Sequence, residues 1–214
     1  MFCNHGGMGF FDRNRDALAK QGIDPSRLPP GQYSTERFPV LHMGSTPKYS
    51  AADLATYDVK IGGAVDRPFT LTLDEIKARP AVHVTTDLHC VTKWSKFDTQ
   101  WAGCSIAALL TDARIHPDAT HIMFHCEFGY DTNLPLADVL EPRVALLAYE
   151  YQGEPLEPDQ GFPLRSLVPH LYLWKSAKWI RGIEVMVGDK PGFWERNGYH
   201  MYGDPFREQR HWGD

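Results

Sequence analysis

The sequence predicts an α+β fold, a single domain of mainly antiparallel or mixed sheet with short helices. Sixteen prolines and 18 glycines among 214 residues divide the chain into short segments, so long helices are not expected. Short stretches of alternating or β-branched residues are more frequent than helical ones. Strands and helices show no βαβ rhythm and no segment repeats, which argues against a doubly wound sheet and against a repeat array.

Composition excludes several classes of protein. Hydrophobic residues make up 43% of the chain and charged residues 23%, as in ordinary globular proteins. Twenty-two basic residues against 27 acidic ones give a net charge of −5, so we expect no nucleic-acid partner. No apolar run approaches the roughly 18 residues of a membrane helix, so we expect no membrane partner. The four cysteines form no C-x-x-C pair, and no secretory signal is visible, which predicts a cytoplasmic protein with reduced thiols.

The first 35 residues differ from the rest. Residues 1–35 are expected to form an N-terminal extended arm, and residues 36–214 the domain itself. A short helix is predicted from residue 12 to 21, ended by Gly22. The prolines that follow favour an extended chain. An arm that wraps around the domain and a loosely ordered tail are both compatible with this pattern.

The strands of the domain are predicted from alternation. Alternating or β-branched segments cover residues 57–61, 69–73, 82–86, 121–126, 144–151, 154–156 and 179–187. Two of these segments are separated only by Gln152-Gly153, which predicts a hairpin.

Short helices are predicted between the strands. Thr72 and Glu75 have the spacing of a capping box, so a helix is expected to begin there and to end before Pro80. Further short helices are expected over residues 105–110 and around Asp138.

Cys90 is the first candidate for chemistry. It follows a predicted strand at the edge of a loop, where a reactive group is held rigidly yet stays reachable. Neighbouring His89, Lys93 and Lys96 are expected to lower its pKa and to favour the thiolate, which binds metals or attacks substrates. The alternative is that Cys90 is a small buried hydrophobic residue.

A second candidate is a cationic segment with the features of a phosphate cradle. Arg165 offers a bidentate fork, and Lys175 and Lys178 flank Ser176. The glycine-rich order of a P-loop is missing. A solvated cationic stretch is the alternative, but two tryptophans among these charges favour a partly buried loop.

Two further candidates are weaker. The aromatic tail over residues 193–200 is expected to dock on the core. His121 and His125 share one face of a strand and could join the cysteines in a zinc site, but their spacing gives no support for it.

These segments, taken in order, resemble the molybdopterin-binding domain of the sulfite oxidase family. The motifs that carry the resemblance are His89-Cys90-Val91-Thr92-x-Trp94-Ser95, Trp101-x-Gly103, Tyr130-Asp131-Thr132-Asn133-Leu134-Pro135-Leu136, Leu147-Ala148-Tyr149-Glu150-Tyr151-x-Gly153-Glu154-Pro155-Leu156, Gly161-Phe162-Pro163-x-Arg165-x-x-Val168-Pro169 and Lys178-Trp179-Ile180. The resemblance covers roughly residues 36–200. The arm over residues 22–33 is similar to that of small bacterial, cytoplasmic members.

The resemblance implies a cofactor of molybdenum on molybdopterin, a pyranopterin dithiolene, and a role for each matching residue. Cys90 matches the metal ligand and is therefore the central catalytic residue. Tyr199 matches an active-site tyrosine, and Lys93 is expected to face the substrate. The matching cofactor-binding positions are His42, Arg165, Ser176, Lys178 and the adjacent Lys175.

Departures from the family pattern bear on the substrate. Sulfite-oxidising members carry an arginine where this chain has Val40, and an arginine pair where it has Val91 to Lys93. The pattern after Cys90 is nearer to that of members that resemble methionine-sulfoxide reductases, which are periplasmic. A small oxyanion or an S- or N-oxide is therefore the expected substrate, with an external electron carrier. Too few residues follow Lys178 for the C-terminal dimerisation domain of sulfite oxidases.

Three functions follow as hypotheses. The first is a molybdenum-cofactor oxidoreductase that carries out two-electron oxygen-atom transfer on a small substrate. The second is a molybdopterin-binding module without turnover. The third is a thiol-based or zinc enzyme centred on Cys90, although no second cysteine lies at resolving distance in the sequence.

Overall fold

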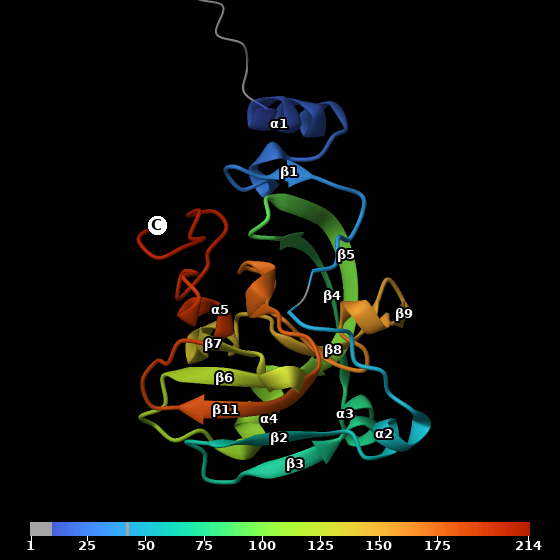
Figure 1. The fold of residues 1–214 in the computed structure, drawn as a ribbon, viewed down its shortest axis with the longest axis vertical. Coiled ribbons are helices and arrows are strands. Elements are labelled where there is room, and N and C mark those ends of the chain that lie inside the picture. Colours follow the sequence, from blue (N-terminus) through green and yellow to red (C-terminus); the bar gives the residue numbers. More distant parts are fainter. Residues whose placement is uncertain (1–9, 42) are drawn as a thin grey trace, which may run out of the picture.

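The computed structural model describes residues 10–41 and 43–214, which form two mixed sheets with short helices around them (Figure 1). This confirms the predicted α+β class. The helices are α1 (Phe10–Lys20), α2 (Ala51–Ala55), α3 (Leu73–Lys77), α4 (Ile106–Ala113) and α5 (Phe193–Arg196). Short 3-10 turns add η1 (Pro25–Arg27), η2 (Glu127–Gly129), η3 (Leu136–Asp138), η4 (Pro158–Gln160) and η5 (Leu173–Lys175).

The first sheet has six strands. They are β1 (Tyr33–Ser34), β4 (Ala81–His89), β5 (Trp94–Ser105), β8 (Leu146–Tyr151), β9 (Glu154–Pro155) and β10 (Arg165–Leu167). The strand β5 is its centre, because β4 pairs with it along one edge while β1 and β8 pair with it along the other. Only the pairing of β1 with β5 is parallel.

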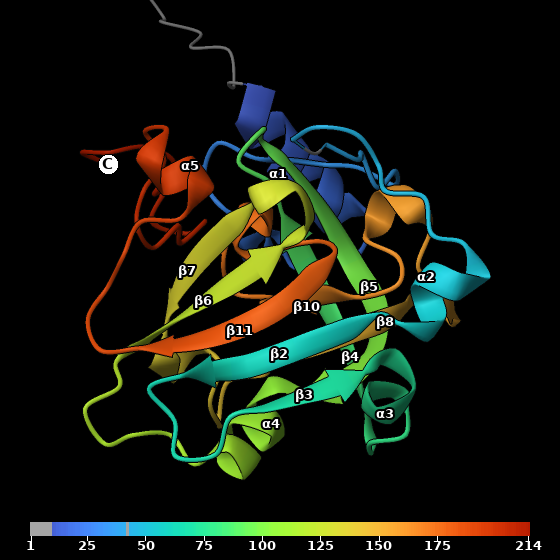
Figure 2. The same cartoon turned by 60° about the horizontal axis from the view of Figure 1, so that its bottom comes forward.

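The second sheet has five strands in the order β3-β2-β11-β6-β7. Their bounds are β2 (Asp58–Gly63), β3 (Phe69–Thr72), β6 (His121–Cys126), β7 (Asp131–Pro135) and β11 (Ile180–Met186). Figure 2 shows this sheet lying in front of the six-stranded one. The core fills the space between them, since Ile61, Phe124 and Ile183 from one sheet cluster with Cys104 and Leu147 from the other.

Local sequence signals place several elements correctly. The Thr72 side chain accepts from the backbone N–H of Glu75, and the Glu75 carboxylate binds the N–H of Thr72, so the capping box that begins α3 is confirmed. Gln152 and Gly153 take φ of 55° and 81° and join β8 to β9 as the predicted hairpin. Around Asp138 the structure has only the 3-10 turn η3, shorter than the expected helix.

The longest strand, β5, was not predicted. Its 12 residues lack alternation, because Trp101 to Cys104 are all buried and face packing on both sides. Asp98 takes φ of 53°, and the register with β4 shifts nearby, so the side-chain pattern is interrupted again. A central strand with bulges cannot be recognised from a period of two.

The segment after α1 lies against the tip of the β4–β5 hairpin. The Arg27 guanidinium binds both Asp87 oxygens, at 3.0 and 2.6 Å, and Asp98 at 2.6 Å. Residues 22–35 therefore contact the domain as a wrapping arm rather than as a loose tail. The division of the chain at residue 35 stays a prediction.

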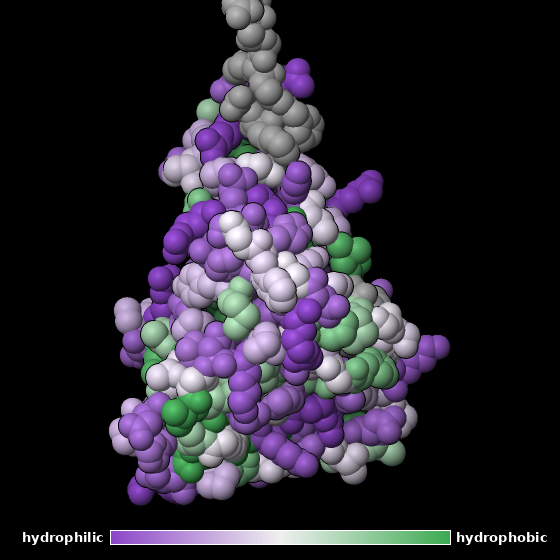
Figure 3. Space-filling model, turned by 60° about the vertical axis from the view of Figure 1, so that its left-hand side comes forward, coloured by the Kyte–Doolittle hydropathy of each residue, from purple (hydrophilic) through white to green (hydrophobic). Residues whose placement is uncertain are grey.

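The helices and one face of the described residues complete the account of the fold. Within the described residues, each helix is too short or too polar to span a bilayer. The face toward the C-terminal segment is mostly hydrophilic, with small apolar groups between the polar side chains (Figure 3).

Candidate active site

A cavity of about 310 Å³ opens beside the tip of the β4–β5 hairpin. It lies between the chain that follows β1, the hairpin loop, the segments around β10 and η5, and the α5 region. Five of the predicted site residues line it together: Cys90, Arg165, Ser176, Lys178 and Tyr199. Lys93 and Lys175 do not line it, and His42 lies outside the described residues.

The turn between β4 and β5 fixes Cys90 in this cavity. The N–H of Lys93 donates to the carbonyl of Cys90 at 3.0 Å, and the N–H of Cys90 donates to the carbonyl of Trp94 at 2.9 Å. Lys93 takes a left-handed φ of 76°, which closes the turn. Cys90 is 9% exposed, and its sulfur accepts a hydrogen bond from the Thr92 hydroxyl at 3.1 Å.

The basic neighbours of Cys90 do not activate it as the sequence predicted. Burial raises the pKa of the Cys90 thiol. The His89 ring turns away to Ser95 Oγ at 2.9 Å, and burial lowers its pKa to about 4. Lys96 donates to the carbonyl of Glu36, and Lys93 is exposed outside the cavity. The expectation that these neighbours hold Cys90 as a thiolate is therefore wrong, whereas the substrate-facing role of Lys93 stays a prediction.

Arg165 and Lys178 form the cationic wall. Arg165 is 2% exposed, and the two terminal nitrogens of its guanidinium donate to the carbonyls of Gln160 and Ser176, each at 2.8 Å. Lys178 Nζ donates to the carbonyls of Leu41 and Asp159, at 3.0 and 2.7 Å. Burial lowers the pKa of Arg165 to about 10. Burial and the nearby Arg165 charge lower the pKa of Lys178 to about 7. Because the two cationic groups repel each other, an anion between them is favoured.

Ser176 shapes the loop that carries this wall. Its hydroxyl accepts from the N–H of Val168 at 2.9 Å, while its carbonyl accepts from Arg165. The side chain therefore ties η5 to the end of β10 at the cavity surface.

Lys175 has a different place from the one predicted. Its ammonium lies 2.6 Å from Glu195 Oε1 and donates to both the carbonyl and the side-chain oxygen of Asn133, each at 2.9 Å. A further bond reaches the carbonyl of Met201 at 2.7 Å. Because these partners surround the fully buried ammonium, Lys175 supports the cavity from behind and does not reach it.

Tyr199 is held by two tryptophans. Its ring stacks on Trp194 with centroids 4.9 Å apart and meets the edge of Trp174 at 5.1 Å. Burial raises the pKa of Tyr199, so its hydroxyl is protonated at neutral pH and can donate a hydrogen bond into the cavity.

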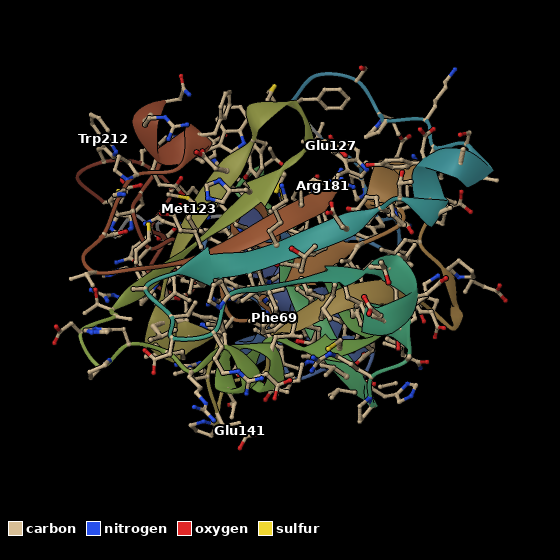
Figure 4. The ribbon with its side chains drawn as sticks, turned by 90° about the horizontal axis from the view of Figure 1, so that it is seen from below. Phe69, Met123, Glu127, Glu141, Arg181 and Trp212 are labelled. Atoms are coloured by element: carbon tan, nitrogen blue, oxygen red, sulfur yellow. The ribbon has the colours of Figure 1, made fainter. Side chains whose placement is uncertain are left out.

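The cavity also contains residues that the sequence did not single out. Phe38, Val40 and Leu41 add an apolar wall, and Glu127 adds a carboxylate. Glu127 lies 3.7 Å from Arg181, and the two are seen side by side in Figure 4. Glu127 could not be predicted from a local sequence pattern. It reaches the cavity because the turn after β6 folds toward β11.

The donor set fits a molybdopterin carrying molybdenum. Cys90 offers a soft sulfur ligand, and the cationic wall offers donors to a phosphate. The indole N–H of Trp94, which also lines the cavity, has no hydrogen-bond partner among the described residues. In contrast, the described part of the chain has no group of three His, Cys, Asp or Glu side chains that could hold a metal ion, so a zinc site lacks ligands there.

Comparisons with known proteins agree with this geometry. The family described as oxidoreductase molybdopterin binding domain matches residues 43–194. The oxidoreductase YuiH of Bacillus subtilis is 46% identical over 191 residues, which cover 89% of this chain and 95% of that protein.

More distant relatives divide between two activities. A putative protein-methionine-sulfoxide reductase subunit of Azospira oryzae is 29% identical over 85% of this chain and 70% of its own length. The mitochondrial sulfite oxidase of Drosophila melanogaster is 34% identical over 67% of this chain, but this match spans only 29% of that protein.

A solved structure supports the fold. The sulfane dehydrogenase SoxCD of Paracoccus pantotrophus superposes with a TM-score of 0.63 at 18% identity, over 74% of this chain and 44% of that one. The extent of the family match, the relative at 46% identity and the fold lead to one conclusion. The chain belongs to the sulfite oxidase-like family of molybdopterin-binding oxidoreductase domains, whose cofactor is molybdenum on molybdopterin.

Proposed function

We propose that the chain is an enzyme that transfers an oxygen atom to or from a small substrate, with Cys90 as the metal ligand. The observation that supports this most directly is convergence in one cavity. Cys90, Arg165, Lys178 and Tyr199 come from segments far apart in the sequence and line the same cavity. A residue set that combines a soft ligand, phosphate donors and a protonated hydroxyl is what oxygen-atom transfer at such a cofactor requires.

The residues have separable roles in this proposal. When bound, the cofactor supplies two-electron oxygen-atom transfer. Arg165 and Lys178 bind the pterin phosphate, with Ser176 holding their loop. Tyr199, protonated and fixed between two aromatic rings, donates a hydrogen bond to the oxygen of the substrate. His42 stays a proposed pterin contact on the resemblance alone.

A second observation favours a neutral S- or N-oxide over sulfite. The basic side chains that line the cavity in the described residues are Arg165 and Lys178, and the pterin phosphate is proposed to take both. The remaining lining is mostly apolar, and its acidic residues, Glu127 and Asp159, disfavour an anion. A relative named as a methionine-sulfoxide reductase subunit agrees with this choice of substrate class.

The electron partner and the location stay part of the proposal. We propose an external electron carrier, because oxygen-atom transfer to or from one substrate requires that two electrons be removed or supplied in each turnover. We also propose that the chain works in the cytoplasm, because its cysteines at positions 90, 104 and 126 are free thiols. Fractionation of the native host, followed by an immunoblot, tests this location, and enrichment in a periplasmic extract would contradict it.

Molybdenum content tests the proposed function. The chain is expressed in a cofactor-competent host, and metal per chain is measured for the wild type and for Cys90→Ala. We expect near one molybdenum per wild-type chain and loss of all turnover in Cys90→Ala. Cys104→Ala is the matched control, because Cys104 is also buried but lies outside this cavity.

The other outcomes decide between the remaining hypotheses. Full activity in Cys90→Ala would refute the ligand assignment. A wild type that binds molybdenum but turns over no sulfite, sulfoxide or N-oxide would favour the module without turnover. A wild type without molybdenum would favour the thiol-based enzyme, against which the raised pKa of the Cys90 thiol already argues.

A further inference from the structure

The N-terminal arm reaches the turn that carries Cys90. Strand β1 runs parallel to the start of β5, with Tyr33 opposite Trp94 and Ser34 opposite Ser95. The N–H of Tyr33 donates to the carbonyl of Lys93 and that of Thr35 to the carbonyl of Ser95, both at 2.9 Å. The arm is therefore an added strand beside the Cys90 turn.

One side chain of the arm is buried inside this junction. Gln32 is 0% exposed, and its Nε2 donates to the carbonyl of Cys90 at 3.1 Å. Its Oε1 accepts from the Ser95 hydroxyl at 3.3 Å. The Ser95 oxygen in turn lies 2.9 Å from His89 Nδ1, which donates to it when that nitrogen carries the ring proton. A continuous set of hydrogen bonds thus runs from His89 through Ser95 and Gln32 to the carbonyl of Cys90.

Both backbone polar groups of Cys90 are consequently held. Its N–H binds Trp94, and its carbonyl accepts from Lys93 within the turn and from Gln32 in the arm. Fixing the peptide groups on either side of a residue fixes its φ and ψ, and with them the direction in which its side chain leaves the backbone. The direction of the sulfur into the cavity therefore depends in part on a residue 58 positions earlier.

The arm is anchored at two points before Gln32. Before it, Arg27 binds Asp87 and Asp98, which lie on the two strands of the hairpin. Beside it, a terminal nitrogen of Arg210 donates to the carbonyl of Pro30 at 3.2 Å, so the C-terminal segment also contacts the arm. These contacts hold the arm, and with it Gln32, in a fixed position against the hairpin.

We propose that Gln32 is a positioning residue for Cys90, and that the arm is in this way part of the active site. The expected effect on cofactor binding rests on the proposed role of Cys90 as metal ligand. The positioning itself concerns the thiol and can be measured without any metal.

The test uses the full-length chain with Gln32→Met, which keeps the length of the side chain and removes both hydrogen bonds. Gln21→Met is the matched control, because Gln21 precedes the same arm and is exposed. Alkylation of Cys90 by iodoacetamide is followed by mass spectrometry at one fixed pH. This measurement uses protein from a host that does not make the cofactor, and only variants that unfold cooperatively are compared. Molybdenum per chain is measured in protein from a cofactor-competent host.

We expect Gln32→Met to raise the rate of Cys90 alkylation at least tenfold and to lower molybdenum per chain, with Cys104 alkylation unchanged. Ser95→Ala, which removes the hydroxyl that donates to Gln32 and lies beside His89 Nδ1, is expected to give a smaller rise and serves if Gln32→Met does not fold. Gln21→Met should match the wild type.

The proposal is overturned if Cys90 alkylation stays within twofold of the wild type in the folded variants, or if Cys104 alkylation rises in parallel with it. These outcomes are distinct from a failure of the proposed function. That failure would appear as normal turnover in Cys90→Ala and would leave the alkylation rates unaffected.

Discussion

The ammonium group of Lys175 and the carboxylate of Glu195 lie 2.6 Å apart, and both side chains are fully buried. Trp174 Nε1 donates to the same carboxylate oxygen at 2.8 Å. The pair thus joins η5 to α5, the two segments that supply Trp174 and Trp194 on either side of Tyr199. An ion pair behind the cavity therefore holds the aromatic support of the proposed substrate-facing hydroxyl.

Removing one partner of this pair should destabilise the protein strongly. Glu195→Gln leaves a buried ammonium without its counter-charge, which costs about 3–5 kcal/mol. For a chain of this size that corresponds to a fall in Tm of roughly 6–20 °C. Arg196→Gln is the control, since the ion pair of Arg196 with Asp131 is half exposed and worth at most about 1 kcal/mol. Calorimetry on both variants checks this, and equal Tm values would contradict it.

Tyr199→Phe should lower kcat without unfolding the protein. Loss of a hydrogen-bond donor at a developing charge costs about 10²–10³ in rate. Tyr202→Phe is the control, because the Tyr202 hydroxyl binds Asp138 at 3.0 Å outside the cavity. The measurement is steady-state turnover on sulfoxide, N-oxide and sulfite. Unchanged turnover of every substrate by Tyr199→Phe would contradict the role proposed for this hydroxyl.

Anion binding to the cofactor-free chain should weaken as the pH rises. Lys178, with a pKa of about 7, is a cation below that value and neutral above it. Sulfate does not titrate in this range, so its affinity should be greatest below pH 7 and fall on the order of tenfold per pH unit above the pKa of the complex. Titration calorimetry from pH 6 to 9 measures this. Lys178→Met should bind weakly at every pH, and a steep pH dependence in that variant would assign the effect to another group.

Buried His89 should make the fold sensitive to acid. Its pKa is about 4 in the folded chain against 6.5 for the ordinary imidazole, so the unfolded chain binds more protons between these values. The contribution of His89 to the free energy of unfolding is therefore fully present above pH 6.5. It is lost as the pH falls toward 4, by about 3 kcal/mol in all. His89→Gln should lose less stability over this window than the wild type, in urea unfolding at pH 6.5 and 4.5. His83→Gln, an exposed change on the same strand, should behave as the wild type.

Elements that depend on neighbouring residues were predictable from the sequence. The capping box of α3 and the Gln152-Gly153 hairpin were located correctly, because their hydrogen bonds and dihedral angles are set within a few residues. The same holds for Cys90 at the end of a strand, although the pKa of its thiol was predicted in the wrong direction. Sequence proximity of His89 and Lys93 did not mean that their charges reach the sulfur.

By itself, then, the sequence determined the α+β class, the family and the short elements. Only the tertiary structure decided that β5 is the central strand, that Lys175 pairs with Glu195 behind the cavity, and that Gln32 holds the Cys90 carbonyl. The physical reason is desolvation. A buried lysine or amide must find partners wherever the packed chain supplies them, and those partners lie 20 and 58 residues away from Lys175 and Gln32 respectively, beyond any local pattern.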